Sequence, residues 1–271
     1  MKNYTKIMCI IVILQLIGCV SPKTNYPTID QHELQLETQR HNQLAADAKL
    51  KKELAARRKF QDKKNRLFDV SSYILTGGVR LCKKMNLPVD ECFYEFELLD
   101  SGTTNAYTDG KKIFITTAMM NFCKTDEELA IVLGHEYAHN IMGHIKSKQT
   151  NMLFGSALGV LLDAAASSQG IETGSAFNKL GSQVGALSYS QEFEKEADYV
   201  GLYITSISGY NVDTAPDFWR RMSIRDHRSI NSGRTHPSNP ARTLALSKVV
   251  QEIANKKKAG LVLTPDIKLR K

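Results

Sequence analysis

Residues 125–145 read TDEELAIVLGHEYAHNIMGHI, and this stretch decides the fold of the chain. Thr125 and Glu128 form a capping-box pattern, because a threonine hydroxyl and a carboxylate three residues later can satisfy free backbone N–H groups of a first helical turn. Apolar residues then recur at near-helical spacing, which predicts a helix with one buried face. These apolar residues are Leu129, Val132, Leu133, Tyr137, Ile141 and Ile145.

The predicted helix carries His135-Glu136-Tyr137-Ala138-His139, which has the pattern HExxH. A spacing of four places both imidazoles on one helix face, one turn apart, so that a single zinc ion can bind both. Glu136 then reaches the water molecule that such an ion activates. The histidine and glutamate content of the chain makes an accidental match expected at about one in a hundred. A catalytic zinc ion still needs a third protein ligand and one open position.

Candidates for the third ligand lie in residues 192–198, EFEKEAD. Glu194 and Asp198 are one helical turn apart, so the first could bind zinc while the second accepts the free N–H group of a ligand histidine. The alternative interpretation of this segment is a solvated acidic face of a helix. The HExxH pattern upstream favours the metal-binding interpretation.

These motifs resemble the M48 zinc metallopeptidases, a family that includes Ste24-type and HtpX-type proteases and periplasmic lipoproteins. The resemblance runs through most of residues 67–247. Ala138 stands where the family more commonly has glycine, and the turn at residues 109–111 departs from the usual glycine-rich one. The matching segments are Asn105-Ala106-Tyr107, Ile113 to Thr116, His135 to His139 with His144, Glu194 to Asp198 with Gly201, and Thr235-His236-Pro237 with Arg242.

The resemblance implies which residues complete the zinc site. Its ExxAD element points to Glu194, rather than Glu192 or Glu196, as the third ligand. Asp198 falls at the position that supports a ligand histidine. One zinc ion per chain is therefore expected.

The resemblance also implies that His236 and Arg242 line the active site. His236 either stabilises the oxyanion or binds the zinc ion in a resting state. His144 lies five residues after His139 and has rotated off the ligand face of a continuous helix, so we expect a structural role for it. Substrate is expected to lie extended along the edge strand at Asn105 and Ala106, because main-chain pairing recognises peptide without a side-chain requirement.

The expected activity is that of a zinc endopeptidase with Glu136 as the general base. Its substrates are expected to be polypeptides, in particular misfolded or unassembled proteins of the cell envelope. The alternative is a chaperone-like binding lipoprotein whose zinc site His236 keeps closed. A structural anchor with a decayed site is a third possibility, and the intact Glu136 argues against it.

The N-terminus has the pattern of a signal peptide over residues 1–18. Its apolar run is shorter than the roughly 20 residues that span a bilayer. Residues 16–19, LIGC, resemble the bacterial lipobox, which implies lipidation of Cys19; an uncleaved anchor is the alternative. Because Val20 is not acidic, the resemblance to lipoprotein sorting implies an outer-membrane address facing the periplasm, so that the chain meets the membrane through its N-terminal lipid.

The charge of the 271 residues is unevenly distributed. A spacer over residues 19–29 leads into a basic helical arm over residues 30–66, and a basic tail covers residues 248–271. Residues 67–247, the metallopeptidase-like domain, hold 16 basic and 20 acidic residues. The net charge of +8 therefore comes from the ends of the chain, and no nucleic acid is expected as a partner.

The remaining patterns predict an α+β fold that is mostly helical. Helices are expected at residues 30–66 and 67–85, and alternating apolar residues at 93–99 and 112–116 predict a small sheet with a hairpin turn at residues 109–110. The expected architecture is gluzincin-like, with the HExxH helix packed on this sheet and a long helical arm at the N-terminus.

Two further features stay open on the sequence alone. Cys82 and Cys92 are ten residues apart and form the easiest disulfide in an oxidising compartment, but three free buried cysteines, Cys123 included, are the equal alternative. Residues 152–187 are rich in Gly, Ala and Ser and predict a buried or mobile helical hairpin rather than a membrane insertion. By resemblance this hairpin lies near the cleft, and we hypothesise that it gates substrate access.

Overall fold

The structure is a computed structural model that describes residues 27, 29–187, 190–225 and 240–267. The signal-peptide region, Cys19 and His236 lie outside the described residues. Contacts within the chain divide it into two units, residues 1–56 and residues 57–271.

A single long helix, α2 (Gln31–Lys84), stands where two consecutive helices were expected. Neither glycine nor proline interrupts residues 31–76, so no local signal ends the helix near Arg66. What changes there is burial: residues 31–59 are all exposed, whereas Leu67, Val70 and Ile74 are buried. The predicted boundary therefore marks a change of environment along one helix.

The sheet has three strands, β1 (Glu95–Leu99), β2 (Ala106–Thr108) and β3 (Lys112–Thr116), in the order β1-β3-β2. β2 and β3 form an antiparallel hairpin, and β1 pairs with β3 in parallel. The Asp109 side chain closes the hairpin by accepting two backbone N–H groups of the turn at 2.8 Å each. The small sheet with a hairpin is thus confirmed.

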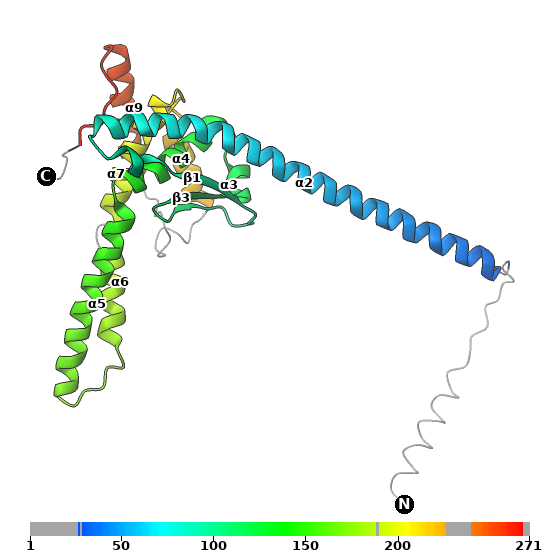
Figure 1. Ribbon diagram of the computed structural model, residues 1–271, viewed down its shortest axis with the longest axis horizontal. Coiled ribbons are helices and arrows are strands. Elements are labelled where there is room, and N and C mark those ends of the chain that lie inside the picture. The colour runs from blue at the N-terminus through cyan, green and yellow to red at the C-terminus, as the bar shows by residue number, and fades with distance from the viewer. Residues whose placement is uncertain (1–26, 28, 188–189, 226–239, 268–271) are drawn as a thin grey trace, which may run out of the picture. The chain divides into compact units, whose positions relative to one another are not determined.

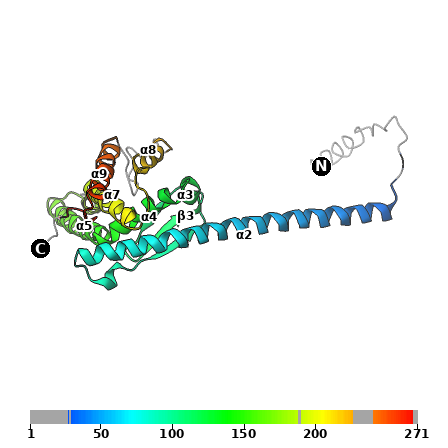
Figure 2. The same ribbon diagram turned by 90° about the horizontal axis from the view of Figure 1, so that it is seen from above.

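Helices make up most of the second unit, and α4 (Asp126–Ile141) is the central one. It packs against β2, β3 and α7, and its residues from Glu128 to His139 are all buried. Figures 1 and 2 show α4 beside β3 and α7. The α+β, mostly helical fold class is confirmed. The other elements are η1 (Val89–Cys92), α3 (Thr117–Phe122), α5 (His144–Ser168), α6 (Ala176–Leu187), α7 (Ser190–Ile207), α8 (Ala215–Arg225) and α9 (Pro240–Lys258).

Two glycines allow α4 and α7 to approach closely. A Cβ atom on Gly134 would lie 2.5 Å from the hydroxyl of Thr205 and 2.7 Å from the carbonyl oxygen of Gly201. A Cβ atom on Gly201 would lie 2.9 Å from the backbone N and Cα of His135. The helices therefore cross backbone to backbone, which brings the HExxH residues against the helix that carries Glu194.

The segment between α4 and α7 forms the expected helical hairpin, with α5 and α6 side by side (Figure 1). Its large apolar residues between 152 and 180 are exposed rather than buried, with Leu153 and Phe154 more than two thirds exposed. Asp163, which interrupts the apolar run, accepts hydrogen bonds from the Thr173 hydroxyl and the backbone N–H of Asn178 and so closes the tip of the hairpin. Among the described helices, none combines the length and the hydropathy that a membrane span requires.

A disulfide joins Cys82 near the end of α2 to Cys92 in η1. It selects one of the two alternatives that the sequence left open for this pair. Cys123 is a free thiol and is buried. Burial raises the pKa of this thiol to about 12, so that it is protonated at neutral pH.

Candidate metal centre

The helix that carries the HExxH residues begins as the sequence predicts, with one difference. Thr125 is the N-cap, and its hydroxyl accepts the backbone N–H of Glu128 at 3.4 Å. The Glu128 carboxylate accepts the N–H of Lys124 at 2.8 Å, one residue earlier than in a capping box, and pairs with Arg221 at 2.8 Å. This partly buried ion pair ties the start of α4 to α8.

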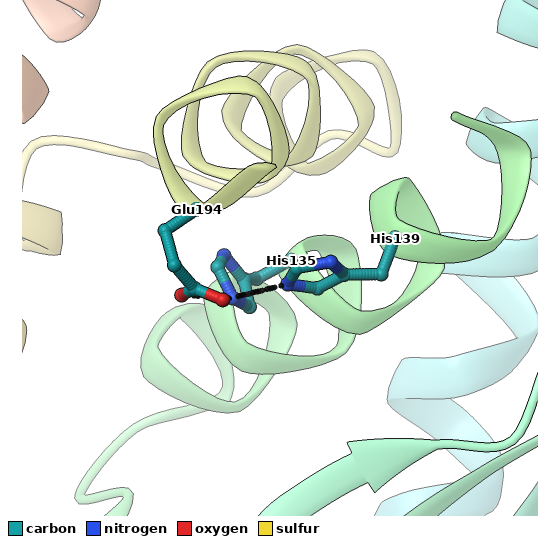
Figure 3. A group of neighbouring side chains, drawn as sticks. All are labelled: His135, His139 and Glu194. Carbon is teal, nitrogen blue, oxygen red and sulfur yellow. Dashed lines mark hydrogen bonds and ion pairs between the residues drawn. The ribbon is translucent and has the colours of Figure 1, made fainter. Parts of the chain in front are cut away.

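Three donor groups converge where α4 crosses α7 (Figure 3). The Nε2 atoms of His135 and His139 are 3.1 Å apart. One carboxylate oxygen of Glu194 lies 3.4 Å from Nε2 of His135, and the other lies 3.3 Å from Nε2 of His139. All three side chains are buried, with at most 6% of each residue exposed.

These spacings suit a zinc ion. Zn–N and Zn–O bonds of about 2.0–2.1 Å place tetrahedral ligand atoms about 3.3 Å apart. The three measured separations, 3.1, 3.3 and 3.4 Å, all lie close to this value. Two imidazoles and one carboxylate are also a donor set of known catalytic zinc sites.

The second nitrogen of His135 points to a buried carboxylate. Nδ1 of His135 lies 3.0 Å from Asp198, four residues after Glu194 on α7. Burial acts to lower the pKa of His135, but Asp198 and Glu194 outweigh it and raise this pKa to about 9. The contact with Asp198 holds Nδ1 of His135 on the far side of the ring, so that Nε2 faces Glu194.

Arg242 on α9 holds Asp198 in place. Its Nε and Nη2 atoms donate to the two oxygens of Asp198 at 2.7 and 2.8 Å, and its Nη1 lies 3.5 Å from Glu194. The guanidinium group stacks 3.8 Å above the centre of the Trp219 ring. Burial acts to raise the pKa of Asp198, but the charge of Arg242 and the contact with His135 hold it below the usual range.

The second nitrogen of His139 contacts another imidazole. Nδ1 of His139 lies 2.9 Å from Nδ1 of His144, and Nε2 of His144 lies 2.9 Å from a carboxylate oxygen of Glu196. The ring of His144 stacks on Phe193, with centroids 4.5 Å apart. The sequence predicts a structural role for His144 on a continuous helix, but α4 ends at Ile141 and His144 begins α5, so its ring reaches His139.

The remaining site residues lie on the helix and on the edge of the sheet. Glu136 is buried on α4 between the two histidines. Ala106 begins β2, which is an edge strand of the sheet, and Asn105 precedes it and pairs with Thr116 through its backbone. The Thr108 hydroxyl donates to Asn140 at 2.6 Å, next to His139, and so ties this strand to the HExxH helix.

Comparison with known proteins places the whole centre inside one matched region. A model of peptidase family M48 matches residues 72–250. Mitochondrial metalloendopeptidase OMA1 of Schizosaccharomyces pombe is 28% identical over 171 residues, which cover 62% of this chain and 50% of that protein. Beta-barrel assembly-enhancing protease of Yersinia pestis is 28% identical over 161 residues, 57% of this chain and 33% of that protein. The chain thus spans half or less of the length of these two relatives.

Proposed function

The chain belongs to peptidase family M48, and on that premise we propose that it is a zinc-dependent endopeptidase with one zinc ion held by His135, His139 and Glu194. The observation that carries this proposal is the convergence of three buried donors at separations of 3.1–3.4 Å, which suit tetrahedral zinc. Metalloendopeptidases among the relatives support the same activity.

The chemistry divides between the ion and the protein. Zinc held by His135, His139 and Glu194 would lower the pKa of a coordinated water molecule toward about 7 and would polarise the carbonyl group of the scissile bond. Glu136 acts as the general base: it accepts the proton of the attacking water and delivers it to the leaving amine. Because Glu136 lies between His135 and His139 in the sequence of α4, it stays close to both proposed ligands.

Three other residues complete the proposed site. Asp198 orients His135, and Arg242 acts by holding Asp198 and by placing a positive charge 3.5 Å from Glu194. His236, which lies outside the described residues, is proposed to stabilise the oxyanion or to bind the zinc ion in a resting state. Substitution of Asp198, Arg242 or His236 is therefore expected to impair a different part of the site.

The proposed substrate is an extended polypeptide that pairs with β2 at Asn105 and Ala106. The N–H group and the carbonyl oxygen of Asn105 already bond to Thr116, so the free main-chain groups of this edge come from the β2 residues that follow it. An edge strand binds peptide through such groups with little demand on the side chains. We propose misfolded or unassembled proteins as the substrate class. One relative, a beta-barrel assembly-enhancing protease, bears a name that supports a role in protein assembly.

The proposed location is the bacterial cell envelope, with lipidation at Cys19 and an outer-membrane address facing the periplasm. The lipobox-like residues 16–19 support the anchor. The disulfide between Cys82 and Cys92 supports an oxidising compartment. Because some relatives are mitochondrial proteins by name, the relatives alone do not supply this address.

Two variants of the full chain test the activity. Glu136→Gln should keep one zinc ion per chain and lose peptidase activity by at least about 100-fold, since the general base is gone. His139→Ala should lose both zinc and activity. The measurements are zinc content and chelator-sensitive cleavage of an unfolded protein such as reduced casein.

The same measurements separate the alternative function. A wild-type chain that binds one zinc ion, cleaves nothing and keeps an unfolded protein soluble would be the chaperone-like lipoprotein. Full peptidase activity in Glu136→Gln would refute the proposed mechanism.

A further inference from the structure

His144 and Glu196 form a chain of contacts that ends on a metal-facing histidine. His144 is the first residue of α5 and is 3% exposed. One of its nitrogens lies 2.9 Å from His139 and the other lies 2.9 Å from Glu196. None of the proposed catalytic steps uses either residue.

The positions of the hydrogen atoms follow from the geometry. Nε2 of His139 faces His135 and Glu194, so a metal ion there takes its lone pair. The neutral imidazole of His139 then carries its hydrogen on Nδ1 and donates it to Nδ1 of His144. Nε2 of His144 must in turn carry a hydrogen, which it donates to the Glu196 carboxylate. With a metal ion on Nε2 of His139, this arrangement of tautomers satisfies the whole chain of contacts.

A break between α4 and α5 places His144 where it can contact His139. Gly143 adopts a left-handed conformation with φ of +68°, which ends α4 and starts α5 in a new direction. His144 can therefore turn back toward His139, which a residue five positions along a continuous helix does not do. Phe193 on α7 stacks on the His144 ring, with an angle of 14° between the planes, and fixes its orientation.

Each of the two proposed ligand histidines is thus supported by a carboxylate on α7. Nδ1 of His135 lies 3.0 Å from Asp198, whereas Nδ1 of His139 contacts His144, which in turn contacts Glu196. A carboxylate behind a metal-bound histidine fixes its ring and raises its basicity, and such partners matter for metal affinity. His139 is supported by a carboxylate in the same way, except that the imidazole of His144 lies between the two groups.

We infer that His144 and Glu196 are positioning residues that hold His139 in the tautomer and orientation needed to bind zinc. This inference deepens the proposed function and rests on its assignment of His139 as a zinc ligand. His144 itself does not contact the ion in this scheme.

The test measures zinc affinity of the full chain after metal removal, by competition with a chromophoric chelator. His144→Phe keeps a ring to stack on Phe193 but cannot accept the hydrogen of His139, and its zinc dissociation constant should rise about 10- to 100-fold. Glu196→Gln should raise it about 3- to 10-fold, less because this side chain is 41% exposed. Glu192→Gln is the matched control: it removes the same charge from the same helix at an exposed site, and should change affinity less than twofold.

A double variant separates positioning from general damage to the fold. Because both residues act through His139, His144→Phe combined with Glu196→Gln should bind zinc no more than about twofold weaker than His144→Phe alone. Urea unfolding of the metal-free proteins reports a merely structural role, which would lower stability without changing zinc affinity. If His144→Phe does not fold, the zinc affinities of Glu196→Gln and Glu192→Gln are compared instead, and their difference tests the positioning role.

Each outcome bears on a different claim. Wild-type zinc affinity in His144→Phe, or equal effects of the two glutamine substitutions, overturns the positioning role and leaves the peptidase proposal intact. A wild-type chain that binds zinc but cleaves nothing refutes the peptidase proposal, while the affinity ratios still judge His144. A wild-type chain that binds no zinc overturns both.

Discussion

Replacing Gly201 by alanine tests whether the close crossing of α4 and α7 sets the geometry of the metal centre. The added Cβ atom would lie 2.9 Å from the backbone N and Cα of His135. Ordinary van der Waals contact begins near 3.4 Å, so the two helices must separate by about 0.5 Å. The atoms in the way belong to the backbone of a proposed ligand residue and cannot rotate aside.

The expected effect on zinc follows from this displacement. Nε2 of His135 and the Glu194 carboxylate are 3.4 Å apart, close to the tetrahedral spacing of about 3.3 Å. A shift of about 0.5 Å exceeds the roughly 0.2 Å within which zinc-ligand distances vary. We expect zinc binding at least tenfold weaker, which corresponds to about 1.4 kcal/mol.

The expected effect on folding is smaller. Overpacking costs about 1–3 kcal/mol, and alanine recovers about 1 kcal/mol of helix propensity relative to glycine. The free energy of unfolding of the metal-free chain should therefore fall by about 0–2 kcal/mol. A tenfold loss of zinc affinity in a chain that remains folded would show that the crossing serves the site as well as the core.

The assay is chelator competition for zinc, with urea unfolding of the metal-free chain beside it. Gly102→Ala is the control, because a Cβ atom there meets nothing within 4 Å. Zinc affinity of Gly201→Ala within twofold of the wild type would refute the reasoning, whatever the effect on stability.

Two further substitutions test the supports around the centre. Arg242→Met should lower the free energy of unfolding by about 3–5 kcal/mol, because it leaves the buried Asp198 carboxylate without its cation; a loss below 1 kcal/mol in urea would contradict this. Replacing both Cys82 and Cys92 by alanine should cost about 3 kcal/mol through the closed loop of ten residues, and equal urea midpoints for the oxidised wild type and the double variant would count against it.

The parts of the fold that the sequence predicts well are those decided by local signals. The N-cap at Thr125, the HExxH helix and the hairpin turn at Asp109 each depend on residues within one turn of one another. The predicted boundary between a helix over residues 30–66 and one over residues 67–85 is wrong, because α2 continues through it. What changes near Leu67 is the burial of the side chains, which requires the folded chain.

The same distinction between local and long-range signals applies to the residues of the candidate site. His135 and His139 are set by spacing on one helix, and the ExxAD element points to Glu194 through a family resemblance. The partner of Arg242 lies 44 residues away, so only the folded chain shows that it is Asp198. The contact between His144 and His139 could not be predicted from residue spacing, because it depends on the left-handed turn at Gly143. The glycine itself was the available signal of that turn.

The hypothesis that the hairpin of α5 and α6 gates substrate access remains a prediction, and the structure sharpens what it must explain. α5 starts at His144, which contacts His139, and Glu194 lies near the start of α7, the helix that follows α6. A displacement at the base of this hairpin would therefore act on two of the three proposed zinc ligands. Cross-linking α5 to α6 within the hairpin should leave zinc affinity unchanged, whereas a displacement at its base should weaken it.

The centre is best understood as a property of a helix crossing. Each proposed ligand histidine on α4 has its second nitrogen directed, in one step or two, to a carboxylate on α7, the helix that also supplies Glu194. The spacing of all these groups depends on a backbone contact that only glycine permits. Residues that never touch the ion, such as Gly201 and His144, should therefore change zinc affinity at least about tenfold, whereas loss of a ligand such as His139 abolishes binding.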